Sequence, residues 1–193
     1  YILKGDIGVT VAEAEIAEYA VTIVQSDNQT ITVNCNGVDY TESFIASYGT
    51  SYTTTIKSIR GFIAGTLSSS SGTITSDIVI SATEAIDNRV TATLIQSDNQ
   101  TITVINTSDN DTILSEGDNT IVRGDVVKIK LTPKDGFGIG SINIDGSYTL
   151  GPKEEEYTYY TLNDSVIISA SDAVSTLCTV TIVPTENQNI SVV

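Results

Sequence analysis

Apolar and polar residues alternate along short stretches of the whole chain. Val21–Ile23 and Ile31–Val33 carry an apolar residue at every second position, the pattern of a strand with one buried face. Turn-forming residues at 25–29 separate the two stretches, so together they predict a hairpin. Asn36-Gly37 lies between further alternating residues and predicts a second hairpin with a type I′ turn.

The alternation continues through the rest of the chain. Tyr52–Ile56 and Val127–Leu131 predict two more strands, and Ile78–Ala82 and Val166–Ala170 predict another two. The segment 11–18 differs because it contains good helix formers; we expect a short linker there, since isolated short helices are marginal. The pattern predicts an all-β fold of tandem small β-sandwich or β-grasp-like repeat modules.

A nine-residue string divides the chain into repeats. The residues of 25–33 return unchanged at 96–104, 71 positions later, and a diverged copy follows at 186–192. The closing strand gives the second spacing, because Ile80 returns as Ile168, 88 positions later. A fixed internal period is typical of repeat architectures. We therefore expect four segments: 1–18 as the C-terminal part of a preceding repeat, 19–88 as a β-repeat module, 89–176 as a longer module with an insertion, and 177–193 as the N-terminal hairpin of a further repeat.

The second spacing exceeds the first by 17 residues, and matched glycines locate the excess. Gly61-Phe62 matches Gly136-Phe137, 75 positions later, so 4 residues enter before this pair and 13 enter between it and Val166. These 13 include 152–156 and predict a loop or an added hairpin. Because the chain starts and stops within repeats, we expect a piece of a longer protein.

Composition narrows the classes of function. Nine basic side chains against 24 acidic ones give the 193 residues a net charge of −15, which repels nucleic acid. No apolar run approaches 18 residues, so we expect no membrane span, and no signal peptide is visible. The chain lacks histidine, the commonest general base and metal ligand and a member of the Ser-His-Asp triad. We expect no catalytic residue, no cofactor and no bound metal.

Two cysteines, Cys35 and Cys178, do not make a disulfide framework. They belong to different repeats, and Cys178 falls where the preceding repeat has Val90. We expect two unpaired structural thiols, with Cys178 as a small buried apolar residue.

One stretch of the second module follows the motif of a known family. Gly124–Phe137 reads Gly-x-x-Val-x-Ile-x-Leu-x-Pro-x-x-Gly-Phe, and 166–170 reads Val-x-Ile-x-Ala. The stretch resembles the InlB B-repeat family and, more broadly, Ig-like repeat modules of bacterial and phage surface proteins. The first module keeps Gly61-Phe62 but lacks the proline, and neither module has the Gly-Trp that usually follows in the family. The resemblance implies a tandem β-module used as spacer, decoration or adhesin, with no catalytic residues to transfer.

Three features could carry chemistry, and each also has a plain structural interpretation. Asp109–Asp111 and Glu154–Glu156 could supply oxygen ligands to Ca²⁺, but neither has the spacing of a calcium loop, and solvated turns explain them. Gly136–Gly140 lacks the following helix of a phosphate-binding loop, so a turn and a bulge explain its glycines.

The third feature is the tyrosines, the most abundant aromatic residues of the chain. An exposed row of them could stack on sugars or form a protein interface, although alternating strand packing also explains them. A cluster of tyrosines lies among the excess residues of the second module. We therefore predict an interaction surface at Tyr157, Tyr159 and Tyr160.

These features together predict a non-catalytic structural or interaction protein of an extracellular assembly. A phage virion component (head decoration, tail or fibre) is the first expectation, and a bacterial cell-surface adhesin or stalk module that binds glycan or a host receptor is the alternative. The expected location is extracellular or on the virion surface. The expected partners are other copies or subunits of the same assembly, with a glycan or host surface second. Unpaired strands at 177–193 should also recruit a neighbouring module.

Overall fold

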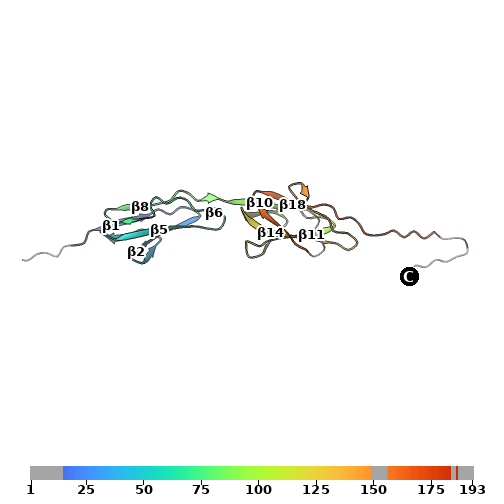
Figure 1. Cartoon of the computed structure of the whole chain (residues 1–193), viewed down its shortest axis with the longest axis horizontal. Coiled ribbons are helices and arrows are strands. Elements are labelled where there is room, and N and C mark those ends of the chain that lie inside the picture. Colours follow the sequence, from blue (N-terminus) through green and yellow to red (C-terminus); the bar gives the residue numbers. More distant parts are fainter. Residues whose placement is uncertain (1–14, 149–155, 184–185, 187–193) are drawn as a thin grey trace, which may run out of the picture. The chain divides into compact units, whose positions relative to one another are not determined.

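The computed structural model describes residues 15–148, 156–183 and 186. Its regular elements are β-strands, and no helix occurs among the described residues, so the predicted all-β fold is confirmed (Figure 1). The chain divides into two compact units, 1–87 (unit 1) and 88–193 (unit 2). Most of the linker predicted at 11–18 lies outside the described residues, as do Glu154 and Glu155 of the predicted acidic loop.

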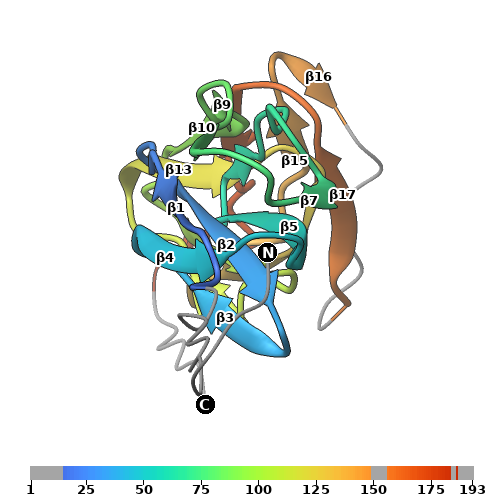
Figure 2. The same cartoon turned by 90° about the vertical axis from the view of Figure 1, so that its left-hand side faces the viewer.

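Unit 1 is built from two larger sheets and one small pair. The strand orders are β4-β1-β8, β3-β2-β5-β7 and β6-β9, and β1 pairs antiparallel with β4 but parallel with β8. Figure 2 shows β1 and β4 together with β2, β3 and β5. The bounds are β1 (Glu18–Ile23), β2 (Gln29–Cys35), β3 (Val38–Tyr40), β4 (Phe44–Ser47), β5 (Ser51–Ser58), β6 (Phe62–Ile63), β7 (Ser71–Thr73), β8 (Ile78–Ile80) and β9 (Ile86–Asp87).

Unit 2 uses the same plan with an added hairpin. Its sheets run β13-β10-β18-β15-β16 and β12-β11-β14-β17, and β10 again has one antiparallel and one parallel neighbour. The bounds are β10 (Arg89–Leu94), β11 (Gln100–Asn106), β12 (Thr112–Ile113), β13 (Gly117–Val122), β14 (Asp125–Pro133), β15 (Ile142–Ile144), β16 (Ser147–Tyr148), β17 (Thr158–Leu162) and β18 (Val166–Ala170).

The hairpin predicted from Val21–Ile23 and Ile31–Val33 is wrong. Both stretches are strands, but β1 and β2 belong to different sheets, and so do β10 and β11. Alternation shows that one face of each strand is buried, yet it does not say which sheet the strand joins. The turn at 25–28 therefore carries the chain from one sheet to the other.

Each unit buries its core between its two larger sheets, as in a β-sandwich. In unit 1, Val21 and Ile80 from one sheet pack in the same cluster as Ile31 and Val33 from the other, and all four are fully buried. In unit 2, a cluster of fifteen buried side chains draws in the same way on β10, β11, β14 and β18. The polar residues between them point outward, which explains the alternation.

The predicted type I′ hairpin at Asn36-Gly37 is confirmed. It joins β2 to β3, and both residues have positive φ, 53° at Asn36 and 80° at Gly37. A second turn of this kind joins β15 to β16, with φ of 50° at Asp145 and 79° at Gly146. This second hairpin belongs to the excess residues of unit 2.

The strand registers reveal where the excess residues of unit 2 lie. Tyr52 of β5 pairs with Gly72 of β7, and Val127 of β14 pairs with Tyr160 of β17. Both pairs occupy the same place in their sheets, so β17 corresponds to β7. Tyr160 therefore replaces a residue of unit 1 and is not part of an insertion. The excess lies before β17.

Candidate functional site

The repeated string proves to be a structural device. The side-chain amide of Gln25 bonds the backbone of Ile31 twice, with Oε1 accepting from its N–H at 2.8 Å and Nε2 donating to its C=O at 2.8 Å. Gln96 does the same to Ile102, at 2.9 and 2.8 Å. In each unit the side-chain amide thus pairs with β2 or β11 as a neighbouring strand would. It satisfies a backbone N–H and a backbone C=O that no strand covers.

The second glutamine of the string closes the sandwich. Gln100 is 1% exposed; its Oε1 accepts from Gly140 N–H at 3.0 Å and its Nε2 donates to Ser171 C=O at 2.6 Å. Gln29 joins Gly65 and Thr83 in the same way, at 2.7 Å each. The repeated residues therefore hold the fold together.

The glycine-rich stretch 136–140 serves this clamp. A Cβ on Gly140 would lie 2.5 Å from both Gln100 Nε2 and Ser171 O, so only glycine fits. Gly136 has φ of 83° and closes a turn in which Phe137 N–H donates to Lys134 C=O. The stretch is a structural turn, as its lack of a following helix predicts.

The three predicted tyrosines divide between the two faces of β17. Tyr160 is half-buried and packs against the core of unit 2, whereas Tyr159 is 65% exposed and Tyr157, just before the strand, is 40% exposed. In unit 1 the place of Tyr160 belongs to Gly72, where a Cβ would lie 2.8 Å from the Tyr52 hydroxyl. Each unit thus puts one large ring at this cross-strand pair, from opposite strands. Tyr160 is a core residue.

The outer face of the β12-β11-β14-β17 sheet surrounds the exposed tyrosines. One cross-strand row runs over all four strands, from Ile113 through Ile105 and Lys128 to Tyr159. Lys130 lies two residues along β14, and the ammonium groups of Lys128 and Lys130 lie 5.6 and 5.9 Å from the ring centre of Tyr157. We call these residues the lysine–tyrosine face: Ile105, Ile113, Lys128, Lys130, Tyr157 and Tyr159.

The corresponding face of unit 1 has different chemistry. Its row over β3, β2, β5 and β7 runs from Asp39 through Asn34 and Thr53 to Ser71. Short polar side chains therefore stand where unit 2 has two isoleucines, a lysine and a tyrosine. The two sheets share their register, so the difference in side chains does not follow from the needs of the fold.

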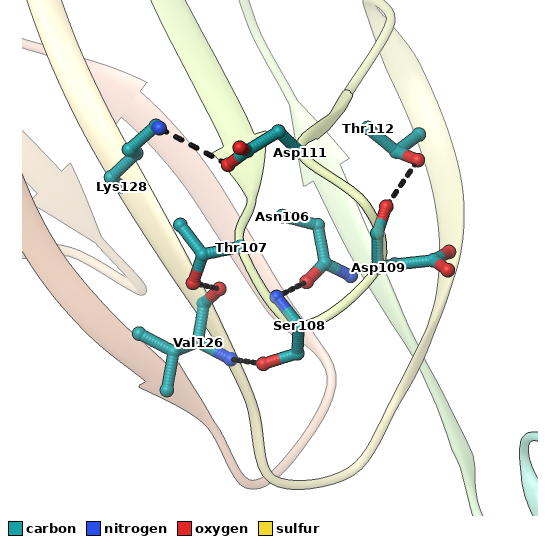
Figure 3. A network of polar contacts seen from close by, with 8 residues as sticks. All are labelled: Asn106, Thr107, Ser108, Asp109, Asp111, Thr112, Val126 and Lys128. Atoms are coloured by element: carbon teal, nitrogen blue, oxygen red, sulfur yellow. Dashed lines mark hydrogen bonds and ion pairs between the residues drawn. The ribbon is translucent and has the colours of Figure 1, made fainter.

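The loop between β11 and β12 fixes one charge on the lysine–tyrosine face. Asp111 has φ of 55°, and its carboxylate accepts from Lys128 Nζ at 3.1 Å (Figure 3). This hydrogen bond, with the attraction of the carboxylate, raises the pKa of Lys128. The loop itself is anchored, because Ser108 Oγ accepts from Val126 N–H at 3.0 Å and Thr107 Oγ1 donates to Val126 C=O at 2.8 Å.

A buried polar pair supports this loop from below. Asn106 is 1% exposed and donates from Nδ2 to Asp125 Oδ2 at 2.7 Å, and its Oδ1 accepts from Ser108 N–H at 3.0 Å. Val122 N–H also donates to Asp125 Oδ2, at 3.3 Å. The pair ties the ends of three strands together and positions the loop that carries Asp111.

The acidic and cysteine predictions have mixed outcomes. Asp109 and Asp111 lie in a hydrogen-bonded turn, and no group of three or more potential metal ligands occurs among the described residues. Cys35 is buried, and burial raises the pKa of its thiol. The prediction that Cys178 is buried is wrong: Cys178 is exposed, because no described strand flanks it as β13 and β18 flank Val90.

The tyrosines of the lysine–tyrosine face were predicted from the sequence, but its other residues were not. Lys128, Lys130 and Ile105 alternate with buried residues, so their outward direction could have been read from the sequence. Their proximity to Ile113 and Tyr159 could not be predicted from the sequence, because it depends on strand order.

The described part of the chain has no helix long and apolar enough to cross a membrane.

Comparison of the chain with protein-family models and with curated proteins finds no matching family and no relative. The resemblance to InlB B-repeat modules therefore stays a prediction that rests on the motif at 124–137 and 166–170.

Proposed function

We propose that this chain is a non-catalytic structural and interaction protein of an extracellular assembly, foremost a phage virion component such as a head decoration, tail or fibre protein. One observation carries the proposal: both units are closed by the same glutamine clamps, and only Asn88 separates the last strand of unit 1 from the first strand of unit 2. Successive modules of one plan are typical of chains that build length or display surfaces.

The net charge of −15 agrees with this role, because a strongly charged surface keeps an exposed module soluble. The most repeated residues of the chain close the sandwich of each unit. The side chains that differ between the units are therefore the ones available for contacts. The lysine–tyrosine face is one place where the outward side chains of the two units differ.

The experiment that tests the proposal is localisation. Antibodies against the 193-residue chain would be applied to purified virions and to cell-envelope and cytosolic fractions of the source culture. The proposal expects labelling at regular positions on a particle, with a fixed copy number by quantitative mass spectrometry. Recovery from the cytosol alone, or hydrolysis of a polymer by the purified chain, would contradict it.

A bacterial adhesin or stalk module that binds glycan or a host receptor is the second candidate. The exposed ring of Tyr159 beside the Lys128–Asp111 pair favours it, since aromatic rings stack on sugars and charged groups bond hydroxyls. Labelling of the cell envelope and not of virions, together with saccharide binding that Tyr159→Ala removes, would select this alternative.

A further inference from the structure

We propose that the lysine–tyrosine face of unit 2 docks onto a second copy of this chain, at an acidic and apolar face of its unit 1. The inference deepens the proposed role in an assembly and rests on it. It names the partner as another copy, and it predicts a contact between two different faces.

The first observation concerns charge. The face carries two ammonium groups in a chain with a net charge of −15, and Asp111 neutralises that of Lys128. Within the described residues no carboxylate pairs with Lys130, whose ammonium lies over Tyr157. A partner that presents carboxylates beside apolar groups therefore complements this face.

The second observation identifies such a surface on unit 1. On the outside of the β4-β1-β8 sheet, Ile45 is 62% exposed and pairs with Ala20, and Val79 is 63% exposed. At the start of β1, Glu15 and Glu18 line an open depression together with Ile16, which is 71% exposed, and Ser47. We call these residues the glutamate–isoleucine face: Glu15, Ile16, Glu18, Ala20, Ile45 and Val79.

The third observation is that matched cross-strand rows of the two units carry apolar residues on opposite sheets. Unit 1 has Ile45 and Ala20 where unit 2 has Thr120 and Thr91. On the other large sheet the row from Asp39 to Ser71 in unit 1 is polar. The matching row of unit 2, from Ile113 to Tyr159, contains the apolar side chains. Along these rows each sandwich therefore has one sheet face that is more apolar, and the two faces differ in sign of charge. Val79 is matched in unit 2 by Ile167, which is 48% exposed, so this position does not distinguish the units. Such a pair fits a head-to-tail contact, which can extend into a chain of copies.

The area of the lysine–tyrosine face determines how strongly two copies are expected to associate. Five residues each of β11, β14 and β17 and the two residues of β12, at about 4.8 Å between strands and about 3.3 Å per residue, cover about 270 Å². This is below the area of about 800 Å² per partner in a stable interface, so the contact should be transient in solution and gain strength when copies are aligned in an assembly.

Sedimentation equilibrium of the full chain up to about 1 mM, at 150 mM salt, tests the proposal. The salt matters because it screens the mutual repulsion of the acidic copies beyond about 8 Å. The average mass should rise above 20.4 kDa with concentration. A mass of 20.4 kDa throughout would overturn the proposal.

Reversing the charges on each of the two faces gives the decisive test of their pairing. Lys128→Glu with Lys130→Glu, and separately Glu15→Lys with Glu18→Lys, should each weaken association about tenfold, whereas an equimolar mixture of the two double variants should restore it. The matched control is Thr53→Glu with Thr55→Glu on the corresponding face of unit 1, which should leave association unchanged. Absence of restoration in the mixture, with both variants folded by circular dichroism, would contradict the pairing of these faces.

A saccharide is the other possible occupant, and the same variants separate it. If the chain stays monomeric while dextran or laminarin binds and Tyr159→Ala removes the binding, the docking proposal is wrong. Localisation on a particle would be unaffected by that result, so failure of this inference is distinguishable from failure of the proposed function.

Discussion

The clamp formed by Gln100 gives a prediction whose size follows from the structure. Its side chain is 1% exposed and bridges Gly140 N–H and Ser171 C=O, which belong to segments 40 and 71 residues further along the chain. We consider Gln100→Met, which keeps the length and most of the volume of the side chain but removes the amide. The substitution leaves one donor and one acceptor without their partner and opens little cavity.

The magnitude follows from the two lost bonds. A buried polar group without a partner costs about 1–3 kcal/mol, so the variant should lose about 2–6 kcal/mol. A domain is stable by only about 5–15 kcal/mol, so this loss is a large fraction of the stability of unit 2. For a domain of roughly 100 residues, each kcal/mol lowers the melting temperature by about 4–8 °C, so we expect a decrease of at least about 8 °C.

Calorimetry would measure the melting temperature, and hydrogen exchange of β11 and β14 would locate the loss in unit 2. Thr101→Ala, at an exposed neighbouring position, is the control and should change stability by less than about 0.5 kcal/mol. Gln29→Met is the matched variant, and its loss of exchange protection should fall on β2 and β5 of unit 1. Wild-type stability of Gln100→Met would refute the idea that the repeated glutamines close the sandwich.

Four further predictions concern buried and exposed side chains. Truncating the half-buried Tyr160 to Ala should cost about 2 kcal/mol in chemical unfolding, roughly half the cost of a fully buried aromatic, whereas Tyr159→Ala should cost less than about 0.5 kcal/mol; equal losses would contradict their assignment to opposite faces. Asp125→Ala leaves the Asn106 amide buried without its acceptor and should lower the free energy of unfolding by about 2 kcal/mol in urea titration, with Asp125→Asn closer to the wild type. A thiol reagent at pH 8 should modify Cys178 quickly and Cys35 slowly, and similar rates would refute the burial of Cys35. Because the pKa of Cys35 is raised from its ordinary 9.0, its contribution to stability is fully present below pH 9 and is lost as pH rises through the folded-state pKa.

Much of the local structure could be predicted from the chain. Alternation located most of the core strands, because a half-buried strand must place apolar residues at every second position. Asn36-Gly37 specified its turn, since both residues accept positive φ. The outward direction of Tyr159 and the inward direction of Tyr160 are implied by the same period of two.

The candidate face could be predicted only in part. The number of tyrosines in the sequence indicated their importance. The sequence pattern at Lys128 and Lys130 is that of ordinary strand residues, and the pattern at Asp111 is that of a turn residue. Their meeting requires that β14 lie between β11 and β17 and that the loop after β11 turn back over β14. Neither condition has a local signature.

The sequence by itself determined most of the core strands, the repeated string and the acidic character of this protein, because these depend on neighbouring residues and on composition. Only the tertiary structure decided that β1 and β2 join different sheets, that the repeated glutamines clamp distant backbone groups, and that one sheet face of unit 2 gathers lysines, tyrosines and isoleucines. The physical reason is that strand order and sheet membership arise from packing two sheets against each other, and the same alternation satisfies either sheet.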